Sequence, residues 1–146
     1  MEKLKIMRVS EKAVLPLRAT EGSAGMDLSA CLEEPVTIAP GERVRIPTGI
    51  AIGLPSKETV GLVYARSGMA VRDGIALTNG VGVIDSDYTG EIQVGLINLS
   101  KEPYTVNPGQ RIAQLVVAPV LVPTVEEVEN LTKTERGSGG FGSTGR

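Results

Sequence analysis

Residues 79–94 read NGVGVIDSDYTGEIQV, and this stretch carries the pattern that decides the fold. Two turn signals, Asn79-Gly80 and Thr89-Gly90, enclose a short run, and residues 91–94 then alternate between polar and apolar side chains. Alternation with a period of two is typical of a strand with one buried face and one wet face. The stretch therefore predicts short strands that are joined by tight turns.

The same pattern continues along the rest of the chain. Residues 43–46 alternate in the same way, and turn signals recur at 21–22, 40–41, 55–56, 73–74 and 108–109. Short strands at such intervals are typical of a β-sandwich or barrel. We expect an all-β fold, a single-domain β-sandwich or distorted barrel, in which helix is minor. The best helix candidate begins at Thr124, three residues before Glu127, but two turns at most are marginal without packing.

Composition limits the number of domains and the kinds of partner. A chain of 146 residues suits one domain, and with 3% aromatic residues its core must be aliphatic. A net charge of −2 provides no diffuse positive field for long nucleic acid or an anionic membrane. No run approaches the roughly 20 apolar residues of a membrane span, and the first residues do not resemble a signal peptide. We expect a cytoplasmic protein that grips any phosphate locally.

The chain contains no histidine and a single cysteine, Cys31. This composition argues against a zinc site built by the protein, and it removes the commonest general base. A catalytic base would then be a carboxylate, and a metal would be a hard ion bound through oxygen.

Three segments combine small residues with groups that suit an anion or a polar ligand. Residues 65–70, ARSGMA, follow an apolar run and place Arg66 and Ser67 before a glycine. We expect a turn here, in which a guanidinium, a hydroxyl and free N–H groups would make a phosphate cradle. Asp27 stands in a largely apolar run, where it either caps a turn or serves a site. Gln114 shares an apolar face, so its amide is either satisfied by backbone or presented to a ligand.

The stretch that decides the fold also carries a carboxylate in an unusual place. Strand alternation puts Asp85 on the same side as Val81 and Val83, the side that a pocket floor or the core would use. A carboxylate that points inward needs a purpose, and Asp85 is therefore our candidate general base.

The last residues differ from the rest of the chain. Residues 136–146 read RGSGGFGSTGR, a flexible glycine-rich tail that contains the only phenylalanine, Phe141. A large apolar ring on such a tether has a use if the tail closes over a ligand, with Ser143 and Thr144 as hydroxyl donors. We divide the chain into a β domain, residues 1–135, and a C-terminal lid, residues 136–146.

Taken in order, these five segments resemble the five motifs of the trimeric dUTP diphosphatase (dUTPase) family and span residues 24 to 145. The departures from the family pattern are Ala65 and Met69 in the second motif and Thr89 in the third. None of them falls on a residue to which the family assigns chemistry.

The resemblance implies hydrolysis of dUTP to dUMP and pyrophosphate, by attack of a water that Asp85 activates on the α-phosphorus. Such an activity would limit uracil in DNA and supply dUMP for dTMP synthesis. Asn79 would hydrogen-bond the uracil edge, Tyr88 would pack under the deoxyribose and exclude a 2′-hydroxyl, and Asp27 would be an outer-shell or structural residue. The other implied substrate contacts are Arg66, Ser67, Gly68, Gly82, Val83, Gln114, Arg136, Phe141, Gly142, Ser143 and Thr144.

The resemblance also implies a cofactor and an assembly. Mg²⁺ would be held by the substrate phosphates and water, with no direct protein ligand. The family forms homotrimers, in which the first, second and fourth motifs of a site come from one chain, the third motif from another and the tail from the remaining chain.

Two alternative functions stay open at this point. A dCTP deaminase shares the fold and much of the phosphate site, but it needs a glutamate at the pyrimidine amine, where this chain has Asp85 with Tyr88. A nucleotide-sensing regulatory protein would need no water-activating base, although a regulatory partner is compatible with the sequence. The intact third motif and tail favour the hydrolase.

Overall fold

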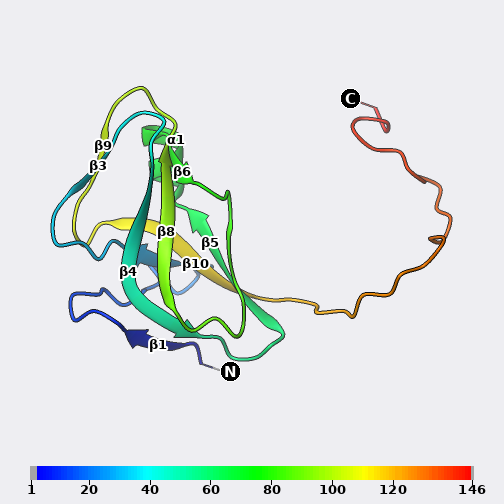
Figure 1. Cartoon of the computed structure of the whole chain (residues 1–146), viewed down its shortest axis with the longest axis horizontal. Helices are drawn as coiled ribbons and strands as arrows, with labels where there is room; N and C mark the ends of the chain where they lie inside the picture. Colours follow the sequence, from blue (N-terminus) through cyan, green and yellow to red (C-terminus); the bar gives the residue numbers. More distant parts are fainter. Residues whose placement is uncertain (1–2, 146) are drawn as a thin grey trace.

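The computed structural model describes residues 3–145, and nearly all of its regular structure is β-strand (Figure 1). Residues 1–2 and 146, the outermost positions of the two expected domain ranges, lie outside the described residues. The elements are, in chain order, β1 (Lys5–Arg8), β2 (Met26–Ser29), β3 (Val36–Ile38), β4 (Arg43–Gly53), β5 (Thr59–Ala65), α1 (Ser67–Asp73), β6 (Ile75–Leu77), β7 (Gly82–Ile84), β8 (Glu91–Asn98), β9 (Tyr104–Val106) and β10 (Arg111–Pro119).

The strands form two four-stranded sheets and one two-stranded sheet. The first sheet has the order β1-β4-β8-β6, the second has the order β2-β10-β5-β7, and β3 pairs with β9. Every strand pair is antiparallel, so short turns suffice for many of the connections. The expected all-β fold is confirmed.

The core lies between the two larger sheets and follows the alternation in the sequence. In β8, Ile92, Val94 and Leu96 are buried, whereas Gln93 between them is exposed. Leu115 of β10 in the second sheet has no exposed surface. Full burial of each such aliphatic side chain contributes about 1.5–3 kcal/mol, which makes this aliphatic core the main source of stability.

The helix α1 is a correction to the turn that we expected at residues 65–70. It spans seven residues, and Met69 is its buried residue. With so little of the helix buried, the 3.6-residue apolar period that would have predicted it cannot be recognised. The helix ends at Gly74, which has a φ of +71° and donates its N–H to the carbonyl oxygens of Met69 and Ala70. The turn signal at residues 73–74 is therefore a helix C-cap.

The candidate helix at Thr124 does not form. Residues 120–145 leave the end of β10 as an extended segment without strand or helix, and they run away from the sheets (Figure 1). Val125 is 99% exposed, so nothing in the same chain provides the packing that two helical turns would need. In the part of the chain that the structure describes, we find no helix with the length and apolar character needed to span a membrane.

Candidate active site

The segment between β6 and β8 crosses from one sheet to the other. Strand β6 pairs with β8 in the first sheet, whereas β7 pairs with β5 in the second. The crossing starts at a turn in which Gly80 has a φ of +72° and donates its N–H to the carbonyl oxygen of Leu77 at 3.1 Å. Glycine suits this turn because a side chain rarely adopts that conformation. The segment therefore bridges the edges of the two sheets.

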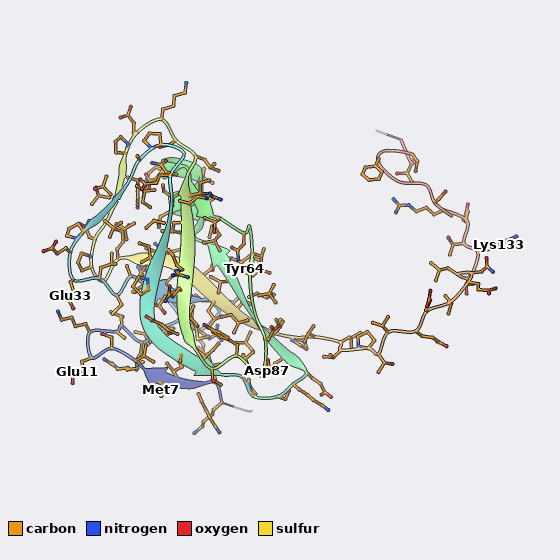
Figure 2. All side chains as sticks on the ribbon, viewed as in Figure 1. Met7, Glu11, Glu33, Tyr64, Asp87 and Lys133 are labelled. Atoms are coloured by element: carbon orange, nitrogen blue, oxygen red, sulfur yellow. The ribbon has the colours of Figure 1, made fainter. Side chains whose placement is uncertain are left out.

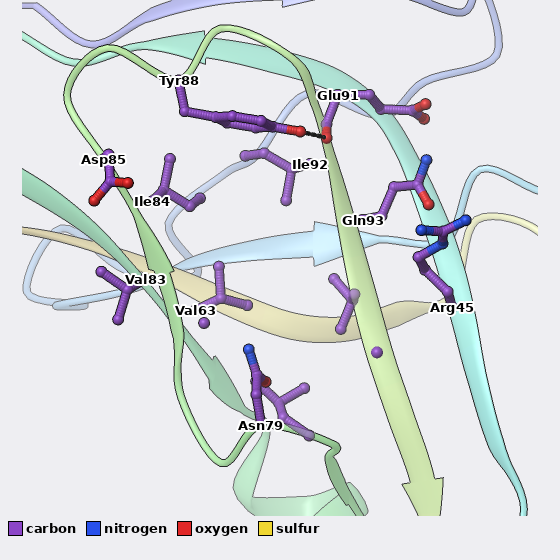
Figure 3. A pocket seen from close by; sticks show the side chains of 14 residues that line it. Arg45, Val63, Asn79, Val83, Ile84, Asp85, Tyr88, Glu91, Ile92 and Gln93 are labelled. Carbon is purple, nitrogen blue, oxygen red and sulfur yellow. Dashed lines mark hydrogen bonds between the residues drawn. The ribbon is translucent and has the colours of Figure 1, made fainter.

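A cavity of about 350 Å³ lies between β7 and β8 (Figure 3). Asn79 stands at one end of it, and Asp85 and Tyr88 stand at the other. Gly82 forms part of the wall, where a Cβ atom would approach the Cβ of Val63 to 3.0 Å, so glycine fits without displacing that side chain. The five sequence-predicted residues of this segment all line the cavity: Asn79, Gly82, Val83, Asp85 and Tyr88. We call it the hairpin pocket.

Asp85 follows directly after β7 and lies on the side that the alternation predicted. Val83 on that side is 64% exposed, whereas Ile84 on the opposite side is buried in the core. Of the two uses considered for this side, the structure supports the pocket and not the core. The carboxylate of Asp85 is therefore open to water and to a ligand, as a general base has to be.

Tyr88 lies across the mouth of the hairpin pocket with its hydroxyl turned toward its own chain. The hydroxyl donates to the carbonyl oxygen of Glu91 at 2.8 Å (Figure 3). With its hydroxyl engaged in this way and the residue 47% exposed, Tyr88 offers mainly its ring to a ligand.

The second predicted group meets where β2, β10 and β5 lie side by side. Gln114 of β10 stands opposite Asp27 of β2 and opposite Tyr64 of β5. Arg66 follows the end of β5, and Ser67 begins α1. Strand pairing thus collects residues that are far apart in the sequence around a cavity of about 620 Å³, which we call the anion pocket. The sequence-predicted residues that line it are Asp27, Arg66, Ser67, Gly68 and Gln114.

Asp27 is an ion-pair partner of two arginines. Its Oδ1 accepts from Nε of Arg66 at 3.1 Å, and its Oδ2 accepts from Nη1 of Arg111 at 3.2 Å. Both carboxylate oxygens therefore face guanidinium groups at the rim of the anion pocket. The pairing fixes the direction of the Arg66 side chain and leaves its remaining N–H groups for a ligand.

The amide of Gln114 is held from two sides. Its Nε2 donates to the carbonyl oxygen of Ala65 at 3.0 Å. Its Oε1 lies so close to Gly25 that a Cβ atom there would stand 2.6 Å away. Of the two uses considered for this amide, satisfaction by backbone is observed, and the residue also lines the anion pocket, where it could meet a ligand. Its second N–H is available for an oxygen of a ligand.

Two further residues that the sequence analysis does not single out, Arg72 and Arg111, also line the anion pocket. Arg72 donates from Nε and Nη2 to the two carboxylate oxygens of Asp73 at 2.9 and 3.0 Å. This hydrogen bond raises the pKa of the Arg72 guanidinium and lowers the pKa of the Asp73 carboxyl. Arg111 belongs to the same segment as Gln114, but its ion pair joins residues 84 positions apart, which spacing alone does not reveal.

The tail residues lie in neither pocket. Arg136 donates from Nε to the carbonyl oxygen of Gly139 at 2.7 Å, within its own segment. Phe141 is fully exposed and has a φ of +53°, a region that favours glycine. Lys133 marks the same segment in Figure 2, far from Tyr64 and Asp87 of the β domain. The structure therefore does not bring Arg136, Phe141, Gly142, Ser143 or Thr144 to the other site residues.

The candidate site residues consequently fall into three groups within one chain. The hairpin pocket and the anion pocket have no lining residue in common, and none of the tail residues that the structure describes, 136–145, lines either of them. A ligand that needs Asn79, Asp85 and Arg66 together cannot reach all of them in a single pocket of one chain.

The protein is an aliphatic β-sandwich with two separate pockets, one small and polar with an aromatic wall and the other rich in arginine. These features define a class of β-proteins that bind small anionic molecules. Comparison with known proteins narrows that class. The family model described as dUTPase matches residues 11–145, and the chain therefore belongs to the dUTPase family.

Individual relatives agree with this assignment. The deoxyuridine 5′-triphosphate nucleotidohydrolase of Desulfitobacterium hafniense is 51% identical over 143 residues, which cover 98% of this chain and 95% of that protein. The dUTPase of Staphylococcus bacteriophage 80alpha with dUPNHPP superposes with a TM-score of 0.90 at 29% identity, covering all of both chains. A mutant dUTPase from phage phi11 of S. aureus, with a structural Mg(II) ion, gives a TM-score of 0.81 at 26% identity, with 90% of this chain and 99% of that chain covered.

Proposed function

We propose that this protein hydrolyses dUTP to dUMP and pyrophosphate. The observation that carries the proposal is the hairpin pocket, in which Asn79, Asp85 and Tyr88 surround one cavity in a chain of the dUTPase family. Asp85 accepts a proton from water, the water oxygen forms a bond to the α-phosphorus, and the bond from that phosphorus to the bridging oxygen of the pyrophosphate breaks.

The base and sugar of the substrate occupy the hairpin pocket. The amide of Asn79 pairs with the uracil edge, and cytosine is rejected because its exocyclic amine reverses the hydrogen-bond pattern. The close wall that excludes the methyl group of thymine is formed by Gly80, Val81 and Gly82, of which Gly82 lines the cavity. The ring of Tyr88 packs under the deoxyribose and leaves no room for a 2′-hydroxyl.

The triphosphate occupies the anion pocket. Arg66 donates to phosphate oxygens from a guanidinium that Asp27 holds in place, and Ser67 and the backbone of Gly68 donate beside it. Gln114 uses its second N–H to hold the attacked phosphate or its water. Positioning and charge stabilisation of this kind supply most of the catalysis in phosphoryl transfer.

We further propose Mg²⁺ as the cofactor, held by the three phosphates and water. The lining of the anion pocket fits an ion that is held by the substrate. Both oxygens of Asp27, the carboxylate that lines this pocket, already accept from arginines, and the other lining residues are cationic or neutral. A structural Mg(II) ion in the dUTPase of phage phi11 supports the choice of metal. When bound with the substrate, the ion offsets phosphate charge and steadies the departing pyrophosphate.

We propose a homotrimer in which three chains complete each site. One chain provides the anion pocket, a second provides the hairpin pocket, and a third provides Arg136, Phe141, Gly142, Ser143 and Thr144. The separation of these three groups within one chain supports the proposal, as does the exposure of apolar side chains such as Leu121 and Leu131 along the segment that leads to the tail. We place the protein in the cytoplasm, a reducing compartment that suits the free thiol of Cys31.

Release of pyrophosphate from a panel of nucleotides tests the activity. We expect turnover with dUTP and Mg²⁺ and little with UTP, dCTP or dTTP. Asp85→Asn should bind dUTP almost normally and lose at least about a hundredfold in turnover, because the isosteric amide cannot accept the proton of water. Ammonia released from dCTP would instead establish a deaminase, and tight binding of dUTP without turnover would leave a nucleotide sensor.

Mixing two inactive proteins tests the shared site. Asp85→Asn chains retain a working tail, and chains that end at Glu135 retain a working Asp85. If the two are unfolded and reassembled at equal ratio, each part is intact at a site with a probability of one half, so about one quarter of the sites should recover. Sedimentation checks that hybrid trimers have formed. Hybrids without recovered activity would show that the hairpin and the tail of each site belong to one chain.

A further inference from the structure

The ring of Tyr88 is held in place by the turn on which it stands. Its hydroxyl donates to the main-chain carbonyl of Glu91 at 2.8 Å, three residues further along the chain. Gly90 lies between them, and a Cβ atom there would stand 2.7 Å from that hydroxyl. Any other residue at position 90 would push the ring away from this tether. The position of Tyr88 therefore depends on the position of the Glu91 backbone.

The side chain of Glu91 is anchored in turn to the body of the protein. Its Oε1 accepts the N–H of Gly49 at 2.9 Å, and Figure 3 shows the carboxylate pointing away from Tyr88. Gly49 lies in the irregular part of β4, where the pairing with β8 shifts between Pro47 and Ala51. The shift takes the Gly49 N–H out of the regular ladder, and the carboxylate of Glu91 satisfies it instead.

The anchor point itself cannot move easily. Gly49 has a φ of +69°, and a Cβ atom on it would lie 2.8 Å from Sγ of Cys31 and 2.9 Å from the Cβ of Ala13. Its carbonyl oxygen accepts from the N–H groups of Val9 and Ser10. Gly49 is therefore fixed from three directions, and Glu91 transmits this fixed position to the turn that carries Tyr88.

We propose that Glu91, which also lines the hairpin pocket, is a positioning residue for sugar selection and acts by holding the ring of Tyr88 in place. The proposal rests on the role of Tyr88 given under the proposed function. A wall excludes a 2′-hydroxyl only if it cannot retreat by the size of one oxygen atom, so selection needs the ring to be fixed as well as present. Loss of the anchor should let the turn and its ring move back. The affinity for the ribonucleotide should then rise relative to the affinity for the deoxyribonucleotide.

Calorimetric titration with dUDP and UDP in the presence of Mg²⁺ measures the preference without catalysis. We expect Glu91→Ala to lower the dUDP preference of the full-length protein about tenfold, the size of a lost hydrogen bond to a charged group. Glu91→Gln keeps an acceptor for the Gly49 N–H and should retain most of the preference. Thr89→Ala is the matched control, because Thr89 is exposed on the same turn and should leave the preference unchanged.

A general structural role would give a different result. If Glu91→Ala weakened dUDP and UDP equally, Glu91 would support the fold and not the selection, and the proposal would be overturned. If that variant did not fold, Tyr88→Phe would decide, because it retains the ring and cuts the other end of the tether. A preference unchanged in Tyr88→Phe would equally overturn the proposal.

The ring signals of Tyr88 give a spectroscopic check. The chain has three tyrosines and no tryptophan, so Tyr88→Phe identifies the signal in an NMR spectrum. We expect a distinct ring signal in the wild type and in Glu91→Gln, and a signal averaged toward that of a free tyrosine in Glu91→Ala. Absence of any dUDP preference in the wild type would refute the proposed sugar selection itself, whereas a preference that survives in Glu91→Ala would refute the role of Glu91 alone.

Discussion

The β domain and the C-terminal segment of this chain differ in whether they bury their apolar side chains. In β10, Ala113 and Leu115 have no exposed surface, whereas Leu121, six residues after Leu115, is 91% exposed. The domain buries its aliphatic residues in two facing sheets, and the segment exposes its own along an extended path (Figure 1). Apolar side chains in such a segment gain nothing from the chain that carries them.

This difference separates what stabilises the fold from what completes the site. Ordering a glycine-rich tail costs about 1–2 kcal/mol per residue in backbone entropy, and residues 136–145, the part of the tail that the structure describes, lie away from the domain and gain nothing from it to offset this cost. Its contribution should therefore appear only when it closes over a bound ligand. We expect the domain to set stability and the tail to set turnover.

Removal of the tail should give the largest effect. A chain that ends at Glu135 should lose at least about a thousandfold in turnover, since one preorganised donor alone is worth about a hundredfold to a thousandfold and the tail carries several. Its free energy of unfolding in urea should change by less than about 0.5 kcal/mol. A clear loss of stability would mean that the tail packs on the domain, and the contrast between the two regions would fail.

The next largest effect should come from replacing one asparagine in each region by alanine and comparing the free energies of unfolding. Asn98 is fully buried: its Nδ2 donates to the carbonyl oxygens of Ile38 and Glu102 at 2.9 and 2.7 Å, and its Oδ1 accepts from Ser100. Asn98→Ala should cost about 3 kcal/mol, because it leaves several buried polar groups without partners. Asn130→Ala, the same change in the exposed segment, should cost less than about 0.5 kcal/mol in the same urea experiment.

The strands could be predicted from the sequence because their information is local. The alternation of residues 43–46 and 91–94 matches the burial of β4 and β8, and strand parity placed Asp85 beside Val83 on the correct side. The glycine-rich tail was also visible from composition alone. Local periodicity is sufficient wherever one face of a strand is buried and the other is wet.

The remaining features depend on contacts between distant positions. Helix α1 was missed because only Met69 of its seven residues is buried, which is too little for a period to appear. Arg111 and Asp27 are 84 positions apart in the sequence, and Glu91 and Gly49 are 42 positions apart. No local pattern encodes such partners. The division of the site into two pockets follows from the pairing of β6 and β7 in different sheets, which the turn signals did not specify.

The smallest effect concerns an ion pair at the surface of the domain, in which the Arg72 side chain is largely exposed. The hydrogen bond from Arg72 lowers the pKa of the Asp73 carboxyl below its ordinary value of 3.8. A lowered pKa contributes stability that is present above pH 3.8 and is lost as the pH falls through the folded value. Because the Arg72 side chain is 75% exposed, the contribution should be small and should shrink in 1 M salt.

Urea unfolding between pH 5 and pH 2 checks this expectation. Asp73→Asn should lack the acid-dependent part of the stability that the wild type loses below pH 3.8, and the two proteins should converge at the acid end. The chain that ends at Glu135 should show the same acid-dependent loss as the full-length protein, because Arg72 and Asp73 both belong to α1 in the domain. If truncation changed that loss, the tail would reach an anion pocket without a bound ligand, and the separation of stability from turnover would have to be given up.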